Sequence, residues 1–288
     1  MVVNDFGGNS DGTGNANGPA DQAVKEIREA GGTAVANYAS VATRAGADST
    51  VQTAIDNFGR IDILINNAGN QRNKRFEDMT DEDFSSVLDV HLNGAFYITQ
   101  TAYKRMMTQR YGRIVFTSSS SALFGNYIRA NYSAAKAALI GLMHSVSLEG
   151  ERYGISANAV LPVASSRLGN APPQALHPDW EEKMPESIPG IAVLGSAMSV
   201  DYVTPLLLYL ASERCKSTHA IWSALGGRYA RAFIGVTKGW IGPAGRPATP
   251  EEIENHLDEI ENRHHYDEPM SVTDELIPVV KALSKRGG

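Results

Sequence analysis

The chain has 288 residues, and its 26 basic and 32 acidic side chains leave a formal charge of −6 at pH 7. This acidic balance, without a long basic run, argues against a nucleic-acid-binding surface and favours a small-molecule partner. Cys215 is the only cysteine, which excludes an internal disulfide and a paired-cysteine metal site and fits a reducing compartment. With no apolar run of about 18 residues or more and no signal-peptide pattern, we expect a cytoplasmic protein without a membrane span.

Short apolar runs alternate with longer stretches of helical period, the pattern of βα units that build a parallel sheet covered by helices on both faces. The sequence therefore predicts a doubly wound, Rossmann-like α/β domain over residues 1–240 and a helical extension over residues 241–288. Strands are expected at residues 2–3, 33–38, 61–66, 113–121 and 155–161, and near 223 or 231–236. Helices are expected at residues 21–29, 48–58, 81–109 and 132–153.

Residues 163–200 change character, because they contain five prolines and show little periodicity. A segment of this length predicts a lid or substrate loop. Thr204 and Pro205 then predict a helix that starts with a hydroxyl cap and a proline in its first turn. In the extension, the sequence TPEE (249–252) is a capping box, which predicts a surface helix over residues 250–263.

One stretch carries candidate chemistry, because it places Ser119 at a strand end and Tyr132 and Lys136 four residues apart on one helix face. A tyrosine with an ordinary pKa near ~10 is a poor proton donor or base at neutral pH unless a cation favours its phenolate. Lys136 supplies such a cation, and Ser119 supplies a hydroxyl for a substrate oxygen. The alternative for an isolated Tyr-x-x-x-Lys pattern is an ordinary surface pair.

Four segments in this order resemble the short-chain dehydrogenase/reductase family: ILINNAG (63–69), GRIVFTSSSS (112–121), NYSAAK (131–136) and NAVLP (158–162). The segments NDFGG, VHLNGAF (90–96) and FGNYIRANYSAAK are similar to the branch that contains the dehydrogenase domain of peroxisomal multifunctional enzyme type 2 and its bacterial homologues. The resemblance covers residues 1–166 well and residues 200–240 more loosely. It implies an NAD-dependent interconversion of a secondary alcohol and a ketone.

The resemblance also implies roles for four catalytic residues. Tyr132 matches the acid/base, Ser119 matches the substrate-orienting serine, and Lys136 matches the lysine that lowers the tyrosine pKa and contacts the nicotinamide ribose. His91 stands where most of the wider family has an asparagine that anchors a proton-relay water, and the branch shares this histidine. The alternative for His91 is a plain packed helix residue.

The cofactor contacts follow from the same resemblance. Asp5 matches the carboxylate on the adenosine ribose, which favours NAD because it would repel the 2′-phosphate of NADP. Ala39, in place of an aspartate, and Val163, after Pro162, depart from the branch pattern and are expected to reduce cofactor affinity. Further implied contacts are Ser40, Val41, Asn67, Ala68, Gly69, Tyr132, Lys136, Ala164, Ser165, Ser166 and Arg167.

The opening MVVNDFGG matches the second strand of the family pattern, whereas its first strand and glycine-rich phosphate turn would stand before Met1. The glycines of residues 12–18 follow the second strand and are not expected to replace that turn. We expect a translation start upstream. The alternatives are that the N-terminal strand shifted inward, the C-terminal extension or another subunit fills the gap in the sheet.

The leading hypothesis is an NAD-dependent dehydrogenase of a 3-hydroxyacyl thioester or a hydroxysteroid-like substrate, assembled as a homodimer or homotetramer. The alternatives are a cofactor-independent lyase, cyclase or isomerase on the same scaffold, and a catalytically silent subunit of a paralogue complex. Arg72, Lys74 and Arg75 are either a solvated loop or a contact for an anionic substrate such as a coenzyme A phosphate. No metal site is expected, since His264 and His265 are interpreted as part of a solvated acidic tail.

Overall fold

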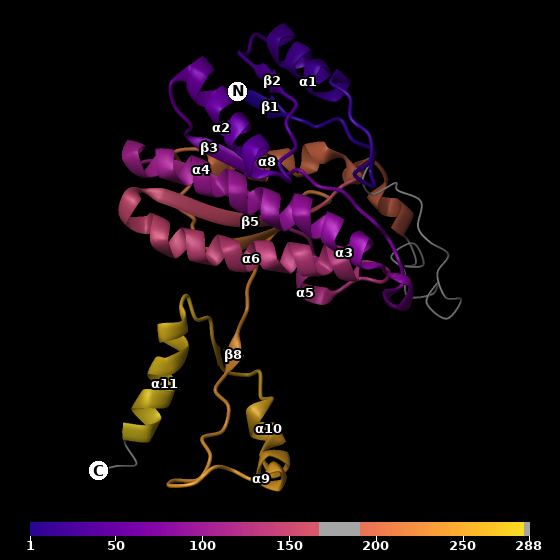
Figure 1. Ribbon diagram of the computed structural model, residues 1–288. Coiled ribbons are helices and arrows are strands. Elements are labelled where there is room, and N and C mark those ends of the chain that lie inside the picture. The colour runs from indigo at the N-terminus through magenta and orange to yellow at the C-terminus, as the bar shows by residue number, and fades with distance from the viewer. Residues whose placement is uncertain (167–190, 285–288) are drawn as a thin grey trace. The chain divides into compact units, whose positions relative to one another are not determined.

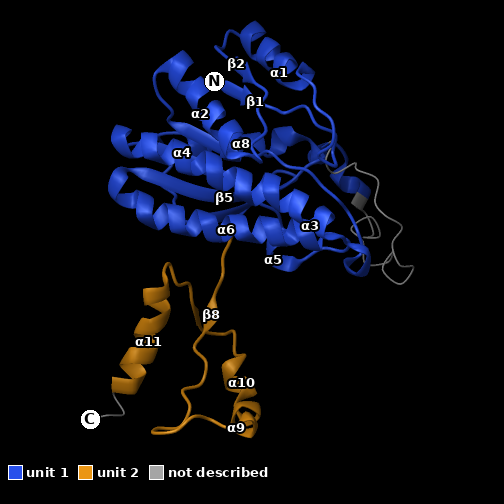
Figure 2. Ribbon diagram, in the orientation of Figure 1, with its two compact units in different colours: residues 1–231 blue, residues 232–288 orange. Residues whose placement is uncertain are grey.

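The computed structural model describes residues 1–166 and 191–284 of the chain. By its internal contacts the chain divides into two compact units, Met1–Arg231 and Ala232–Gly288 (Figure 2). The first unit contains two of the three sheets of the described residues and all the residues that the sequence predicts for the active site. The second unit contains the strands β8 (Val236–Thr237) and β9 (Tyr266–Asp267), which pair antiparallel.

A small parallel sheet opens the first unit. Its strands are β1 (Val2–Asn4) and β2 (Val35–Asn37), with Val2 opposite Val35. The helix α1 (Gly18–Glu29) connects them and has Pro19 in its first turn, where the missing amide hydrogen costs no helical hydrogen bond. The predicted βα unit is therefore confirmed, and the helix starts three residues earlier than expected.

The main sheet has five strands in the order β3-β4-β5-β6-β7. The pairs β3-β4, β4-β5 and β5-β6 are parallel, which confirms the predicted α/β fold with a mostly parallel sheet. The five strands are β3 (Ile63–Asn66), β4 (Gly112–Thr117), β5 (Ile155–Val163), β6 (Ala220–Leu225) and β7 (Arg228–Ala232).

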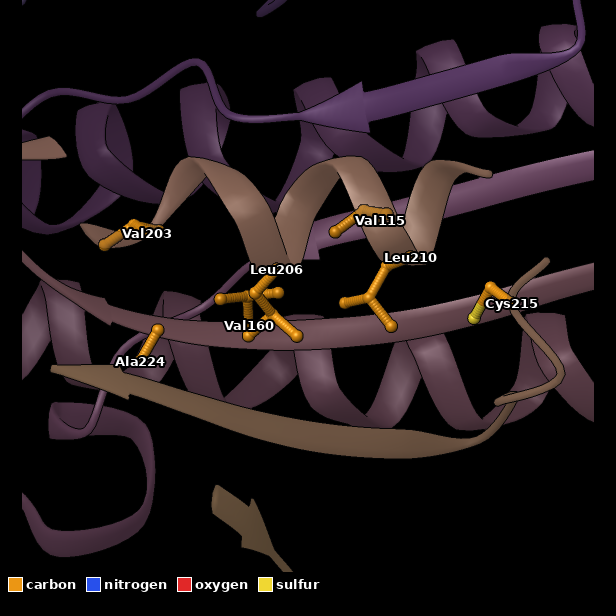
Figure 3. Packing of buried hydrophobic residues seen from close by; sticks show 7 residues of the cluster. All are labelled: Val115, Val160, Val203, Leu206, Leu210, Cys215 and Ala224. Carbon is orange, nitrogen blue, oxygen red and sulfur yellow. The ribbon is translucent and has the colours of Figure 1, made fainter. Parts of the chain in front are cut away.

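Helices pack against both faces of this sheet (Figure 1). The long helix α6 packs on β5 and β4, and α4 packs on β4, β3 and α2. On the other face, Val115 and Val160 point toward Leu206 and Leu210 of α8 and form a buried apolar cluster with them (Figure 3). The helices of this unit beyond α1 are α2 (Arg44–Phe58), α3 (Asp81–Leu88), α4 (Gly94–Gln109), α5 (Ser121–Phe124), α6 (Ala130–Gly150) and α8 (Thr204–Ala211).

The helix predicted over residues 81–109 is present but contains a segment with a wider turn. Between α3 and α4 the chain forms a π-helical segment, Asp89–Asn93, which includes His91. Such single wide turns are rare and are frequent at functional sites. The hydrophobic periodicity continues through the segment, so the sequence pattern did not indicate it.

Two other predicted helix features are wrong in detail. The Thr204 hydroxyl does not cap α8, since it donates to the Val200 carbonyl oxygen at 3.1 Å and Val203 occupies the cap position. The capping box of Thr249 and Glu252 is present, but the predicted 250–263 helix breaks at His256 into α9 (Pro250–Asn255) and α10 (Leu257–Ile260). The helix α11 (Val272–Ser284) follows in the second unit.

Strand β3 is an edge of the main sheet. Within the described residues β3 pairs only with β4, and β1 pairs only with β2. The N-terminal strand does not fill the position beside β3 in the described part of the chain, so that alternative is wrong there. The alternatives of the C-terminal extension and of another subunit stay predictions. Ile63 and Ile65, which lie on one face of β3, are 46% and 42% exposed.

Among residues 1–166 and 191–284, no single helix is long and apolar enough to cross a bilayer. One pair, Ala192–Met198 and Val200–Ala211, satisfies the length and composition criteria only when its two parts are joined across a 78° bend.

Candidate active site

The segment after β4 and the start of α6 bring Ser119, Tyr132 and Lys136 together. Ser119 follows the carboxyl end of β4, and its side chain is close enough to the Tyr132 phenol to lower the pKa of that group. The Ser119 Oγ also accepts from the Ser121 amide at 3.2 Å, which fixes its position at the start of α5. The Lys136 Nζ lies 5.5 Å from the centre of the Tyr132 ring. The structure therefore assembles the three side chains at the end of a parallel strand.

Lys136 is buried rather than paired with a carboxylate. Its side chain is 3% exposed, and its Nζ donates to the Thr117 carbonyl oxygen at 2.6 Å. The Ser118 hydroxyl donates to the Lys136 carbonyl oxygen at 2.7 Å, so β4 and α6 are joined at this level. Burial disfavours the ammonium form and lowers the pKa of Lys136 from its usual 10.5 to about 7.

Tyr132 is 9% exposed, and its burial raises the pKa of the phenol above the ordinary value. Two groups act in the opposite direction and lower it, namely the Ser119 side chain and the positive charge of Arg129. The positive charge of Arg129 therefore acts on the phenol, and the Lys136 Nζ lies 5.5 Å from the centre of the same ring. The role that the resemblance implied for the lysine stays a prediction. Sequence reasoning did not identify Arg129, and its position three residues before Tyr132 was the only available signal.

His91 lies directly against this group. Its ring meets the Tyr132 ring edge-on, with centroids 5.3 Å apart and an interplanar angle of 89°. The Nε2 atom is 3.1 Å from the Asn70 amide nitrogen and 2.8 Å from the Asn70 carbonyl oxygen. Burial, and next the charge of Lys136, lower the pKa of His91 well below its usual range, so the ring is neutral. In the described part of the chain its buried Nδ1 has no hydrogen-bond partner.

Gly69 explains how His91 approaches the turn after β3. A Cβ atom at this position would lie 2.3 Å from the Cε1 of His91, which is closer than any side-chain contact permits. Only glycine therefore allows the imidazole to sit on the turn. This places the predicted cofactor-binding residues Asn67, Ala68 and Gly69 beside the catalytic group, and all three are exposed.

Several other predicted cofactor contacts also follow the carboxyl ends of parallel strands, where ligands bind in open α/β sheets. Asp5 follows β1, and its Oδ1 accepts from the Gly7 amide at 2.7 Å. Ala164, Ser165 and Ser166 follow β5, and the Ser165 amide donates to the Met198 carbonyl oxygen at 2.7 Å.

The loop after β1 reaches the loop after β3, because the Gln71 amide donates to the Ser10 carbonyl oxygen at 2.8 Å. Ser40 and Val41 follow β2, and Val41 packs against Gly94 at the start of α4. Arg167 lies outside the described residues.

These residues fit a dinucleotide at its two ends. The Asp5 carboxylate at the end of β1 is suited to a ribose diol, because an ionised carboxylate accepts hydrogen bonds from two hydroxyls. At the other end, the unpartnered Nδ1 of His91 and the exposed turn of Asn67 to Gly69 leave polar groups beside Tyr132. The arrangement can hold a flat polar ring and a substrate oxygen against one phenol.

A doubly wound parallel sheet that gathers a serine, a tyrosine and a buried lysine at its strand ends defines an α/β oxidoreductase of the nucleotide-binding class. The family model described as short chain dehydrogenase matches residues 12–166. The chain belongs to the short-chain dehydrogenase family.

The relatives agree with the predicted branch. The chain is 36% identical over 290 residues to peroxisomal multifunctional enzyme type 2 of Mus musculus, a match that covers 99% of this chain and 36% of that protein. It is 40% identical over 234 residues to a short-chain type dehydrogenase/reductase of Mycobacterium tuberculosis, covering 81% of this chain and 76% of that protein.

Among solved structures, a short chain dehydrogenase from Mycobacterium avium matches with a TM-score of 0.71 and 31% identity, covering 91% of this chain and 87% of that one. The chain thus spans about a third of the mouse relative but most of the mycobacterial ones.

Proposed function

We propose that this protein interconverts a secondary alcohol and a ketone with NAD as the hydride carrier, on a 3-hydroxyacyl thioester or a hydroxysteroid-like substrate. The observation that carries the proposal is the buried Tyr132, whose ring centre lies 5.5 Å from the Lys136 Nζ and whose phenol pKa is lowered by the Ser119 side chain. Membership of the short-chain dehydrogenase family supports the same chemistry.

In the proposed mechanism the Ser119 hydroxyl donates to the substrate oxygen and holds it against the Tyr132 phenol. Tyr132 gives its proton to the oxygen during reduction and takes it back during oxidation. A nicotinamide, when bound, supplies or accepts the hydride at the carbon that bears this oxygen. The neutral His91 contributes its buried Nδ1, which is suited to hold a water that passes the proton onward.

The cofactor would be held by Asp5 at the adenosine ribose and by Lys136 at the nicotinamide ribose. A carboxylate at Asp5 favours NAD, because the 2′-phosphate of NADP would meet a like charge. Burial keeps the pKa of Lys136 near neutrality, so the lysine can exchange a proton within the physiological range.

The test is hydride transfer by the Tyr132→Phe variant, measured from the absorbance of NADH with a 3-oxoacyl thioester. General acid/base catalysis contributes about 10² to 10⁴ in rate, so kcat should fall by that factor. Tyr229→Phe, at an exposed tyrosine on β7, is the matched control and should retain the wild-type rate.

Two other outcomes would favour the alternatives. Turnover that needs Tyr132 but not NADH would identify a lyase, cyclase or isomerase. Turnover that appears only when a paralogue is added to this chain would identify a silent subunit. The cytoplasmic location and the homodimer or homotetramer remain predictions, and the mouse relative carries a peroxisomal name.

A further inference from the structure

Two histidines stack on each other at the amino end of the main sheet. His144 lies on α6, and His219 directly precedes β6. Their ring centroids are 4.1 Å apart, and the ring planes differ by 19°. His219 is 8% exposed, and His144 is half-buried. Ser119 follows the carboxyl end of β4, which runs in the same direction as β6, so the histidine pair lies at the other end of the sheet from the candidate active site.

Ser147, which lies one turn after His144 on α6, connects the two histidines. Its buried hydroxyl donates its only proton to the His144 carbonyl oxygen at 2.7 Å. The same Oγ atom is 2.7 Å from the Nδ1 atom of His219, so Nδ1 is the donor in that hydrogen bond. A further proton on His219 would bind to Nε2 and make the ring positive.

The backbone before β6 holds His219 from the side of β5. His219 has φ of 61°, in the left-handed region that a residue with a side chain rarely adopts. Its amide donates to the Ala157 carbonyl oxygen at 2.8 Å, and the Asn158 Nδ2 donates to the Ser217 carbonyl oxygen at 2.8 Å. Because such a conformation persists only where the surrounding structure enforces it, residues 215–219 depend on their contacts with β5 and α6.

The surroundings of the pair disfavour a positive charge on it. Within residues 1–166 and 191–284, neither histidine forms an ion pair with a carboxylate. From β7 the charge of Arg231 acts on His219, and from β5 the neighbours Ala157 and Asn158 do not titrate. Burial and the charge of His219 lower the pKa of His144 to about 4, and burial and Arg231 lower the pKa of His219 below its usual 6.5.

Acid therefore acts against the stacked arrangement. If residues 215–219 move away from α6, both rings reach water and their pKa values return toward 6.5, so this open form binds protons that the stacked form excludes. The stacked form is favoured at pH values above 6.5. Its advantage falls as the pH drops from 6.5 toward 4.

We propose that the His144–His219 stack is an acid-sensitive switch, which holds residues 215–219 against α6 at neutral pH and releases them in acid. Histidine is the side chain that ordinarily changes its charge in this pH range. The release is a local opening of the fold, which needs less free energy than complete unfolding. The switch does not depend on the proposed function, because it contains none of the catalytic residues.

Cys215 provides a measurement of this release, because it is the only cysteine of the chain. It lies on the loop between α8 and β6, within the apolar cluster that contains Leu210 (Figure 3), and it is 4% exposed. Its Sγ donates to the Ser217 carbonyl oxygen at 3.7 Å. A thiol that is buried in this way is inert, so its modification rate measures how often residues 215–219 open.

The test is the rate at which 4,4′-dithiodipyridine modifies Cys215 in the full chain between about pH 7.5 and pH 5. This rate is divided by the rate for free glutathione at the same pH, which removes the effect of pH on the reagent and on an ordinary thiol. Below pH 6.5 the ratio should rise by about tenfold per pH unit for each proton that the open form takes up.

Variants assign the rise to the two histidines. His219→Gly removes one ring and keeps the left-handed backbone, which glycine adopts without strain, and His144→Asn removes the other ring. In each variant the remaining histidine has lost its stacked partner, so the rise at pH 5 should shrink by about tenfold or more. His264→Asn, at an exposed histidine of the second unit, is the matched control and should keep the rise of the wild type.

Urea distinguishes the release from complete unfolding. The effect of urea on an opening reaction scales with the surface that the reaction exposes, so a local opening responds weakly. Three results would overturn the inference. These are a ratio that does not change with pH, a rise that persists when both histidines are replaced, and a rise as sensitive to urea as the unfolding followed by circular dichroism.

Discussion

The buried Lys136 makes a quantitative prediction about stability and pH. Its pKa is about 7 in the folded protein because burial disfavours the ammonium form, whereas an unfolded chain restores the usual 10.5. Between these values the unfolded state binds the additional proton, so the stability of the folded state rises with pH. The slope is about 1.4 kcal/mol per pH unit, and the whole effect amounts to about 5 kcal/mol between pH 7 and pH 10.5.

Lys136→Met removes the titrating group and keeps a side chain of similar length. The difference in unfolding free energy, wild type minus variant, should therefore increase by about 1.4 kcal/mol for each pH unit between pH 7 and pH 9. Urea unfolding followed by circular dichroism at pH 7, 8 and 9 measures this difference, and all groups common to both proteins cancel. Lys104→Met, at an exposed lysine of α4, controls for the loss of a lysine in general. A difference that stays constant with pH would refute the reasoning.

Three further predictions concern single residues. Gly69→Ala should lower the free energy of unfolding by about 1 to 3 kcal/mol, because its Cβ would overlap His91. The control Gly141→Ala, in the open middle of α6, should raise the free energy of unfolding by about 0.5 to 1 kcal/mol. Thr249→Ala should lower the stability of helix α9 by about 1 kcal/mol, because it removes the capping hydroxyl. The α9 amides should then exchange their hydrogens faster, and an unchanged exchange rate would contradict the capping box. Asp5→Ser should shift the ratio of kcat/KM by about tenfold toward NADPH, and an unchanged ratio would remove Asp5 from the cofactor site.

Local features of the site and fold could be predicted from the sequence because each depends on residues close together in the chain. The spacing of Tyr132 and Lys136 places both on one face of α6, and Gly59 ends α2 in the left-handed conformation that glycine favours. The parallel sheet followed from alternating strand and helix patterns, which are also local. Family resemblance added the order of the motifs.

Features that depend on packing between distant segments could not be predicted in this way. The burial that lowers the pKa of Lys136 results from the approach of β4 to α6, and no pattern around residue 136 indicates it. The influence of Arg129 on the Tyr132 phenol is of the same kind. The hydrogen bond from the Lys74 amide to the Ile128 carbonyl oxygen likewise depends on two segments more than fifty residues apart.

The edge strand β3 determines which strands could extend the main sheet. Within residues 1–166 and 191–284 this edge has no paired strand, so its amide and carbonyl groups are placed to pair with one further strand. Apolar side chains on the face of Ile63 and Ile65 would gain most from such pairing, since these two isoleucines are the surface left uncovered. A strand one residue out of register would turn its apolar side chains away from them. A strand that pairs with β3 would therefore need apolar side chains at alternate positions, in addition to free backbone groups.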